Sequence, residues 1–353
     1  MTLSKRLTTG KKPKPDWNSL SFGKFFTDHM FVMDYISDEG WTNAGIVPYE
    51  PFLIDPAAMV FHYGQAVFEG LKAYRAADGR TLLFRPAMNF ARFNRSDDRM
   101  CIPPIDEAFV LDALKELLRI DADWIPDAPG TSMYIRPFII ATEAALGVHP
   151  SHAYKFMIIL SPVGAYYQSG LAPVRIIIED EYVRAVRGGV GFTKSSANYA
   201  ISLKGQEKAI EKGYAQVLWL DGIERKYVEE VGTMNVFFRF GDTVVTPELT
   251  GSILPGVTRD SVMRLLRSWN IPVAERKVTV DEIFTAHKAG TLLEAFGSGT
   301  AAVISPIGEF RRGDESITLT GGEIGELSQR LYDTLTGIQY GRLPDTFGWT
   351  VEV

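Results

Sequence analysis

One lysine, Lys194, lies in a segment of small and nearly uncharged residues that extends from residue 187 to residue 199. Burying an ammonium group without a partner is unfavourable, so most lysines lie on solvated surfaces. In this segment the backbone can pass close to a bulky group and leave the amine facing it. A desolvated amine loses its proton more easily and becomes a nucleophile toward aldehydes. The segment therefore predicts a lysine that forms a Schiff base.

Two nucleotide-binding motifs are excluded by the spacing around this lysine. A P-loop needs a glycine directly before Lys-Ser/Thr, whereas Phe192 and Thr193 stand between Gly191 and Lys194. If Gly189 and Gly191 began a dinucleotide fingerprint, its third glycine would fall at Lys194. The glycines of this segment therefore do not indicate either motif.

The composition is that of an ordinary globular protein. The chain has 353 residues, of which 46% are hydrophobic and 23% charged, and this length allows two domains with separate cores. The formal net charge of −6 gives no reason to expect a nucleic-acid partner. Basic residues gather between residues 5 and 14, which indicates a solvated arm. No apolar segment has the length of a signal peptide or a membrane span, so we expect a cytoplasmic protein.

Cysteine and histidine usage argues against disulfides and metals. Cys101 is the single cysteine, so no internal disulfide framework is possible. The chain has five histidines, and none is paired with an acid at the spacing of helical metal ligands. We therefore expect no metal site.

Local patterns predict a mixture of strands and helices. Alternating apolar residues favour antiparallel strands, and apolar residues at helical spacing after a capping Asp106 favour a helix. The expected strands cover residues 29–35, 71–75, 81–84, 133–140, 156–160, 174–178 and 214–220, with a hairpin around 240–242, and further helices cover 200–212, 258–269 and 280–288.

A break in these patterns indicates a domain boundary. Residues 162–173 contain two prolines and two glycines, which is typical of an interdomain linker. We predict a small N-terminal domain over residues 1–163, whose residues 1–19 form a flexible arm. A linker over residues 164–174 follows, and then a large domain over residues 175–353, with the lysine segment at its edge.

Several short motifs occur in a fixed order along the chain. Each one alone is a weak signal, but the whole ordered set is highly specific. The set resembles the branched-chain amino acid aminotransferases, which belong to fold type IV of the enzymes that use pyridoxal 5'-phosphate (PLP). The resemblance extends from residue 22 almost to the C-terminus, and its motifs lie at residues 22–30, 62–74, 84–86, 134–137, 187–199, 230–235, 254–259 and 296–301.

This resemblance implies roles for three residues around the cofactor ring. Lys194 would form the Schiff base with PLP and then move the proton of the substrate α-carbon. Glu230, directly before Val-Gly-Thr, would pair with the pyridine nitrogen and keep it protonated. Its neighbour Glu229 is expected to be an exposed strand residue. Tyr199 would donate a hydrogen bond to the phenolic oxygen of the cofactor.

The resemblance also implies a set of phosphate ligands. Arg92 would bind the phosphate, because a guanidinium group suits bidentate contact with its oxygens. Further arginines between residues 85 and 99 leave open that this is a solvated helix face. Val257 and Thr258 begin an expected helix, where backbone N–H groups favour an anion. Thr300 would add a hydroxyl group.

The substrate pocket must take both an aliphatic side chain and the carboxylate of glutamate. Aromatic residues would form a wall whose hydroxyl groups serve a polar substrate, with core packing as the alternative for each. Arg136 resembles the residue that binds the distal carboxylate of glutamate, and backbone amides around Thr233 and Ala301 would hold the α-carboxylate. The aromatic candidates are Phe25 or Phe26, Tyr63, Tyr134 and Tyr166, and we favour Tyr63 and Tyr134.

The implied fold is an α+β chain with the two-domain architecture of fold type IV aminotransferases, similar to D-amino acid aminotransferase. Its smaller N-terminal domain would be α/β, and its larger C-terminal domain would have a β-barrel-like core. The implied activity is reversible ping-pong transfer of an amino group between L-leucine, L-isoleucine or L-valine and 2-oxoglutarate. Members of the family are at least homodimers, in which Tyr63 would serve the neighbouring site. No nucleic-acid or membrane partner is expected.

Three alternatives remain at this point. A D-amino acid aminotransferase or an aminodeoxychorismate lyase of the same fold would keep the lysine and the glutamate. A non-catalytic protein could have retained the fold without the chemistry. One departure from the family is visible: vertebrate members carry Cys-x-x-Cys after Gly-Thr-Ala, where this chain has Ala302 and Ser305, so that thiol switch is absent.

Overall fold

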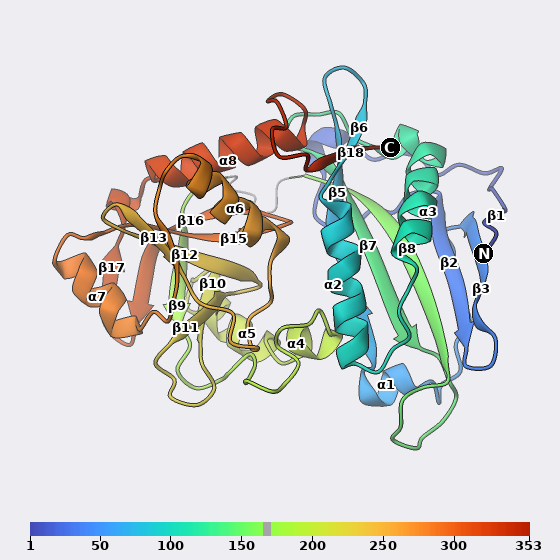
Figure 1. The fold of residues 1–353 in the computed structure, drawn as a ribbon, viewed down its shortest axis with the longest axis horizontal. Coiled ribbons are helices and arrows are strands. Elements are labelled where there is room, and N and C mark those ends of the chain that lie inside the picture. The colour runs from blue at the N-terminus through green and yellow to red at the C-terminus, as the bar shows by residue number, and fades with distance from the viewer. Residues whose placement is uncertain (165–170) are drawn as a thin grey trace. The chain divides into compact units, whose positions relative to one another are not determined.

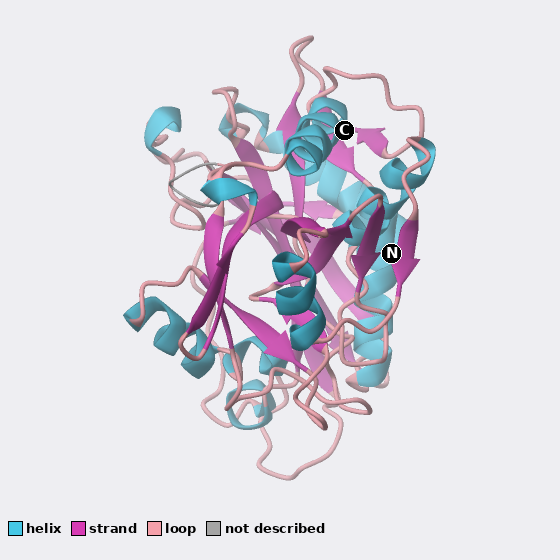
Figure 2. Ribbon diagram, turned by 90° about the vertical axis from the view of Figure 1, so that its left-hand side faces the viewer, coloured by secondary structure: helices cyan, strands magenta, loops and turns pink. Residues whose placement is uncertain are grey.

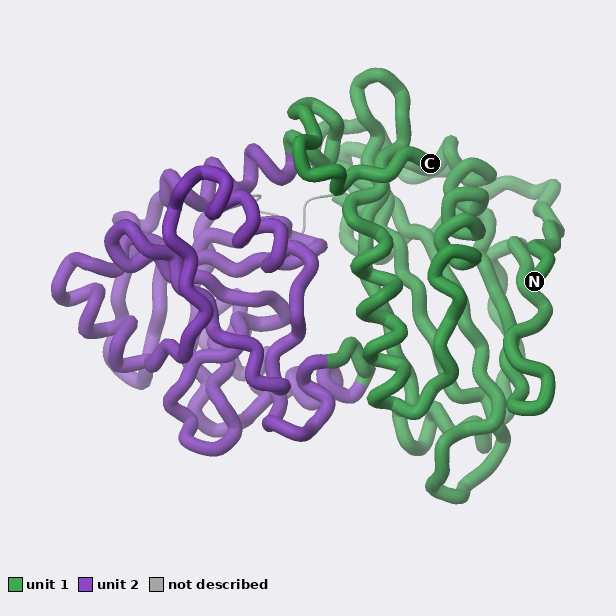
Figure 3. The backbone as a smooth tube through the Cα atoms, in the orientation of Figure 1, with its two compact units in different colours: residues 1–166, 193–196, 337–353 green, residues 167–192, 197–336 purple. Residues whose placement is uncertain are grey.

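The computed structural model describes residues 1–164 and 171–353. The chain divides into two compact units (Figure 3). Unit 1 consists of Met1–Tyr166, Thr193–Ser196 and Gly337–Val353, and unit 2 consists of Tyr167–Phe192 and Ala197–Thr336. The predicted boundaries divided the chain at one linker, whereas unit 1 also contains the segment around Lys194 and the C-terminal residues.

Unit 1 is built on one large sheet (Figure 1). Among its described residues, nine strands are joined in the order β1-β3-β2-β8-β7-β5-β6-β18, with β4 paired to β7 beside this path. The pairs are antiparallel except that of β1 with β3. The strands are β1 (Ser4–Lys5), β2 (His29–Ile36), β3 (Gly40–Pro48), β4 (Ala66–Phe68), β5 (Leu71–Arg75), β6 (Thr81–Phe84), β7 (Ser132–Ala141), β8 (Ala153–Val163) and β18 (Thr350–Glu352).

Two long helices of unit 1 begin at residues that are typical of helix N-termini. Helix α2 (Pro86–Arg99) has a proline at its first position, where the missing N–H leaves no intrahelical bond unmade. Helix α3 (Glu107–Ile120) follows the predicted cap, because the Asp106 carboxylate accepts the N–H of Phe109 at 3.0 Å. Shorter helical pieces are α1 (Met59–Tyr63) and the 3-10 turns Trp17–Ser19 and Ala122–Trp124.

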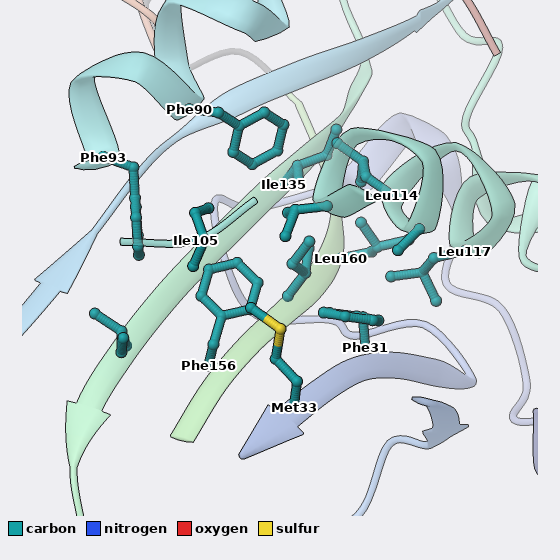
Figure 4. Packing of buried hydrophobic residues seen from close by; sticks show 14 of the residues in the cluster. Phe31, Met33, Phe90, Phe93, Ile105, Leu114, Leu117, Ile135, Phe156 and Leu160 are labelled. Atoms are coloured by element: carbon teal, nitrogen blue, oxygen red, sulfur yellow. The ribbon is translucent and has the colours of Figure 1, made fainter. Parts of the chain in front are cut away.

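The core of unit 1 lies between these helices and the sheet (Figure 4). Phe90 and Phe93 of α2 and Leu114 and Leu117 of α3 pack in one cluster with Phe156 of β8. All five side chains are completely buried. Burying a side chain of this size contributes about 1.5–3 kcal/mol, so this apolar layer fixes α2 on the sheet.

The N-terminal segment, predicted to be a flexible arm, packs along unit 1 instead. The N–H of Thr8 donates to Nε2 of His29 at 3.0 Å, and the N–H of Lys12 donates to the Asp28 carboxylate at 2.9 Å. The basic residues that suggested a solvated arm have carboxylate partners, namely Lys5 with Glu116 and both Lys11 and Lys14 with Asp123.

Unit 2 is built on a closed ring of strands. In the part of unit 2 that the structure describes, six strands are joined in the cycle β11-β10-β9-β16-β15-β12, because β12 pairs back with β11. This confirms the predicted barrel-like core. Strands β13, β14 and β17 extend it. The strands are β9 (Val174–Ile178), β10 (Gln216–Leu220), β11 (Val228–Val231), β12 (Met234–Phe240), β13 (Thr243–Thr246), β14 (Val273–Glu275), β15 (Leu292–Gly299), β16 (Val303–Arg312) and β17 (Glu315–Thr318).

The later helices are labelled in Figure 1 and coloured cyan in Figure 2. The helices predicted over residues 258–269 and 280–288 are confirmed, whereas the helices at residues 196–200 and 326–339 were not predicted. The helix expected over residues 200–212 is interrupted at Ser202, whose hydroxyl donates to the carbonyl of Tyr199 at 2.8 Å. No helix in the described ranges is long and apolar enough to span a membrane. The helices are α4 (Ser196–Ala200), α5 (Leu203–Glu211), α6 (Val257–Ser268), α7 (Val280–Lys288) and α8 (Glu326–Gln339), with a 3-10 turn at Thr320–Gly322.

Candidate active site

One face of α2 carries three buried polar residues, Asn89, Arg92 and Ser96. Their spacing of three and four residues places them on the same side of the helix. Asn89 and Arg92 both donate to Glu69, which follows β4. Ser96 accepts the backbone N–H of Lys194 at its hydroxyl oxygen, at 3.0 Å. This face of α2 therefore holds a carboxylate and the lysine segment together.

Glu69 and Arg92 form a buried bidentate ion pair. Nε of Arg92 lies 2.6 Å from Oε1 of Glu69, and Nη2 lies 2.9 Å from Oε2. Burial alone would raise the pKa of Glu69, but the charge and hydrogen bonds of Arg92 and the charge of Lys194 lower it below its usual value. The carboxylate is therefore ionised and fixes the plane of the guanidinium group.

The backbone of Lys194 is fixed on both sides. Its N–H is bound by Ser96, and its carbonyl accepts the N–H of Phe68 at 3.1 Å. The next residue, Ser195, forms an antiparallel bridge with Val67 of β4. Nζ of Lys194 lies 4.7 Å from the centroid of the Phe68 ring. The lysine is half-buried, on a backbone that is paired like an extra strand residue.

Tyr134 and Arg136 lie on one face of β7, as expected from their spacing of two residues. Nη2 of Arg136 donates to the Tyr134 hydroxyl at 3.1 Å, and its guanidinium lies 4.6 Å from the Phe68 ring. Lys72 of β5 is directly opposite Tyr134 and shares this face. Burial lowers the pKa of Lys72 to about 8. This face therefore combines aromatic surface with cationic groups.

A glycine makes room for the Tyr134 hydroxyl. A Cβ at Gly70 would lie 2.1 Å from that oxygen, which is far inside contact distance. On another side, the Phe22 ring meets the Tyr134 ring edge to face, with centroids 4.9 Å apart. Gly70, which follows the ion-paired Glu69, thus sets the position of the tyrosine.

The other aromatic candidates have different surroundings. Phe25 is 38% exposed. Phe26 stacks on Tyr49 with ring centroids 5.0 Å apart, which is a packing role. Tyr166 lies outside the described residues.

Tyr63 lies at the end of α1 and is 41% exposed. Its hydroxyl donates to the carbonyl of Leu146 in the loop between β7 and β8. The side chain is therefore anchored at its tip while much of its ring faces solvent.

In unit 2, Glu230 of β11 is a buried carboxylate with several partners. It accepts the N–H of Leu254 at 2.8 Å on Oε1, and Nδ2 of Asn235 lies 3.5 Å from the same oxygen. Nε of Arg184 lies 3.1 Å from Oε2. Glu230 is only 3% exposed, so these contacts hold its side chain in one position. Glu230, predicted to pair with the pyridine nitrogen, is therefore a fixed and desolvated carboxylate, as that role requires.

The expectation that Glu229 is exposed is wrong. All four residues of strand β11 are buried, and Glu229 is only 5% exposed. It points away from Glu230, because successive strand residues face opposite sides. Its carboxylate accepts the hydroxyl of Ser252 and lines a pocket of about 160 Å³. Burial raises the pKa of Glu229 to about 7.

The turn between β11 and β12 contains Gly232 and Thr233. Gly232 has a φ of +56°, which favours glycine, and a Cβ there would lie 2.0 Å from Oε1 of Gln216. Its N–H donates to the carbonyl of Val217 at 2.7 Å. Thr233 is exposed at the tip of this fixed turn.

Val257 and Thr258 are the first two residues of α6, as predicted, and both are buried. The helix is preceded by Gly256, which has no side chain to cap the first amides. A Cβ at Gly256 would lie 2.1 Å from Oδ1 of Asn235. The helix start is therefore brought close to the residue that contacts Glu230, and its dipole favours a phosphate group.

The remaining predicted residues lie at turns or helix surfaces of unit 2. Thr300 and Ala301 form the turn between β15 and β16 and are half-buried. Tyr199 lies on α4 and is half-buried.

The predicted site residues thus divide between the two units. Unit 1 brings Lys194 next to Arg92 through α2, and it groups Tyr134 with Arg136 on β7. Unit 2 groups Glu230 with the start of α6 through Asn235. The buried participants that sequence reasoning missed include Glu69, Lys72, Ser96, Arg184 and Asn235. Glu69, Lys72 and Asn235 lie inside motifs that carried the resemblance, and a lysine between apolar residues of a strand was the available signal for Lys72.

Comparison with known proteins agrees with this arrangement. The family model for class IV amino-transferases matches residues 66–310, which places the chain in that class. A Bacillus subtilis protein named branched-chain-amino-acid aminotransferase 2 is 61% identical over 352 residues, covering 100% of this chain and 97% of its own. Branched-chain-amino-acid transaminase 1 of the same organism is 57% identical and covers 99% of each chain. The chain therefore belongs to the branched-chain amino acid aminotransferase family.

Solved structures give the same result for the fold. The Escherichia coli branched-chain amino acid aminotransferase superimposes with a TM-score of 0.77 at 25% identity, over 92% of this chain and 98% of its own. The T.th. branched-chain amino acid aminotransferase complexed with N-(5'-phosphopyridoxyl)-L-glutamate has a TM-score of 0.74 at 26% identity, over 90% and 97% of the two chains. The chain therefore has the predicted fold of type IV aminotransferases.

Proposed function

We propose that this protein is a PLP-dependent branched-chain amino acid aminotransferase. It transfers the amino group reversibly between L-leucine, L-isoleucine or L-valine and 2-oxoglutarate. The observation that carries the proposal is the fixed backbone of Lys194, held by Ser96 and β4 beside the Glu69–Arg92 ion pair. The names of relatives that are 50% or more identical over nearly the whole chain support the choice of substrate class.

The residues present fit PLP by the chemistry of their donors. A desolvated carboxylate, Glu230, suits a protonated ring nitrogen, and a glycine-capped helix start at Val257 and Thr258 suits a phosphate. Arg92, whose orientation Glu69 fixes, would bind the phosphate as well, with Thr300. Tyr199 would donate to the phenolic oxygen. When bound, PLP supplies the electron sink that stabilises negative charge at the substrate α-carbon.

Lys194 holds and moves the proton of the reaction. Its Nζ would accept the proton from the α-carbon of the amino acid and deliver it to carbon C4′ of the cofactor, and it would move a proton in the opposite direction when the oxo acid is aminated. This requires the amine to stay in one place while substrates exchange. Its N–H donates to the Ser96 hydroxyl and its carbonyl accepts the N–H of Phe68, so the backbone is fixed and motion is confined to the side chain.

The face of β7 supplies substrate recognition. Aliphatic side chains would contact the aromatic surface of Tyr134 and Phe25, and Tyr63 would contact the substrate in the site of a neighbouring copy. Arg136 would bind the distal carboxylate of glutamate, and backbone amides at Thr233 and Ala301 would bind the α-carboxylate. The donation from Arg136 to the Tyr134 hydroxyl gives the guanidinium one hydrogen-bond partner when an aliphatic substrate replaces glutamate.

We also propose that the enzyme acts in the cytoplasm as a homodimer or a larger homo-oligomer, without nucleic-acid or membrane partners. The half-exposed ring of Tyr63 supports a position facing a neighbouring copy. A stable monomer in analytical ultracentrifugation would contradict the oligomer.

The test is an absorbance spectrum of the PLP-loaded protein before and after L-leucine. The band of bound PLP should change to that of the aminated cofactor and return with 2-oxoglutarate. Lys194→Ala should abolish the leucine response, whereas Lys204→Ala, which alters an exposed lysine paired with Glu207, should not. A response to D-alanine but not to L-leucine would favour a D-amino acid aminotransferase instead.

A further inference from the structure

The loop between β7 and β8 gathers three metal-ligating side chains, none of which is a candidate active-site residue described above. Glu143, His149 and His152 each place one potential ligand atom within 4.8 Å of the other two. Nδ1 of His152 lies 3.1 Å from Oε2 of Glu143, and Nε2 of His149 lies 3.9 Å from Oε1. The sequence analysis expected no metal site because it considered helical spacing, whereas this cluster forms across a loop.

A backbone carbonyl selects the tautomer of the neutral His149 ring. Nδ1 of His149 lies 2.9 Å from the carbonyl oxygen of Pro150. A carbonyl only accepts, so Nδ1 must carry the proton and, in the neutral ring, Nε2 presents its lone pair to Glu143. Metal-bound histidines commonly have this arrangement, in which the second ring nitrogen donates to a carbonyl.

Glu143 is also fixed before any ion binds. Its carboxylate accepts the backbone N–H of His152 at 2.7 Å, and its own carbonyl accepts the N–H of Met59 at 3.0 Å. The first contact closes the base of the loop, and the second ties the loop to the start of α1.

We propose that Glu143, His149 and His152 form a zinc site. Ligand atoms around tetrahedral zinc lie about 3.4 Å apart, given Zn–N and Zn–O bonds of about 2.0–2.2 Å. From Oε1 of Glu143, Nδ1 of His152 lies 3.3 Å away and Nε2 of His149 lies 3.9 Å away, and these separations bracket that value. Two imidazoles and one carboxylate suit zinc and similar transition cations rather than magnesium or calcium, which prefer oxygen ligands. The side chains are partly exposed, so water completes the coordination.

The site goes beyond the proposed function and does not depend on it. Bound zinc would close residues 144–148 into a loop held at both ends. Leu146 in that loop accepts the hydroxyl of Tyr63, so the ion would also fix the anchor of that side chain.

The test is zinc titration of the tag-free, PLP-loaded protein in competition with a chromophoric chelator. The wild-type protein should bind one zinc ion per chain at this site, and His149→Gln and Glu143→Gln should each weaken that binding by about 10-fold or more. His287→Gln, which removes a histidine on α7 outside the cluster, should leave it unchanged. Cobalt(II) should give the intense visible bands of low-coordinate N/O ligation in the wild type and lose them in His149→Gln. The proposal would be overturned if both cluster variants bound zinc as tightly as the wild type. It would also be overturned if millimolar magnesium displaced the bound zinc.

Discussion

Glu69 accepts two hydrogen bonds from Arg92 on separate carboxylate oxygens, and both side chains are almost completely buried. A buried pair with this geometry leaves each charge dependent on the other. It also links β4 to α2, and hence to the residue that binds the backbone of Lys194. The position of the lysine therefore rests on an ion pair that is not itself predicted to touch substrate.

Glu69→Gln should lower the free energy of unfolding by about 3 kcal/mol, because it leaves the buried Arg92 charge without its partner. Urea denaturation measures this. Glu207→Gln is the matched control, since Glu207 pairs with Lys204 on the surface, and its loss should change stability by less than about 0.5 kcal/mol. Equal effects of the two substitutions would show that the buried pair has no special role.

Gly70→Ala should displace the Tyr134 ring, because the new Cβ would meet the hydroxyl oxygen at 2.1 Å. We expect a loss of about 1–3 kcal/mol in unfolding free energy and a lower kcat/KM for leucine. Tyr134→Phe should recover part of that stability in the Gly70→Ala background, since it removes the clashing atom. Gly10→Ala, where nothing lies within 4 Å of an added Cβ, is the control. If the double variant Gly70→Ala/Tyr134→Phe is as unstable as Gly70→Ala alone, the Tyr134 hydroxyl is not the source of the strain.

Glu229→Gln should stabilise the protein at pH 8 and have little effect at pH 4.5. The pKa of Glu229 is raised to about 7, so the folded state binds more protons than the unfolded state between about pH 4.5 and 7. The contribution of Glu229 to stability therefore falls as pH rises through that window, and glutamine removes this loss. We expect a gain of about 2 kcal/mol at pH 8. Thermal unfolding at both pH values checks it, and a gain that is the same at both would exclude the ionisation of Glu229 as the cause.

Lys72→Met should raise the free energy of unfolding at pH 7 by about 2 kcal/mol. Burial lowers the pKa of Lys72 to about 8, so charging it below that pH opposes folding. Between about pH 8 and 10.5 the unfolded state binds more protons, so the wild-type protein gains stability as pH rises. The advantage of the variant should therefore shrink toward pH 10, as measured by chemical denaturation across that range. An advantage that does not vary with pH would point to packing alone.

Local chemistry made much of the fold predictable from the sequence. The cap at Asp106, the alternation in β2 and the glycine after Phe240 each act within a few residues, and each prediction is confirmed. The helix expected over residues 200–212 is confirmed for residues 203–211 but is interrupted at Ser202, whose hydroxyl donates to the carbonyl of Tyr199 in the preceding turn. The pairing of β18 with β6 could not be predicted, because it joins segments far apart in the chain.

The site residues could be predicted where the chemistry demands one residue type, as at Lys194 and Glu230. Residues that are buried only because the barrel closes could not be predicted. Glu229 resembled an exposed strand residue because no local pattern shows that β11 is covered on both faces. Glu69 lay within a recognised motif, but its role depends on Arg92, which is 23 residues away.

The C-terminal strand β18 pairs with β6, so the last residues of the chain complete the sheet that the first residues begin. A ribosome delivers the chain from its N-terminus at about 5–20 residues per second. Strand β6 is therefore synthesised early, and the edge that pairs with β18 stays unpaired until all of unit 2 has been synthesised. Unit 1 is the first to begin synthesis and the last to complete its sheet, so the nascent protein must protect the unpaired edge of β6 from other strands during that interval.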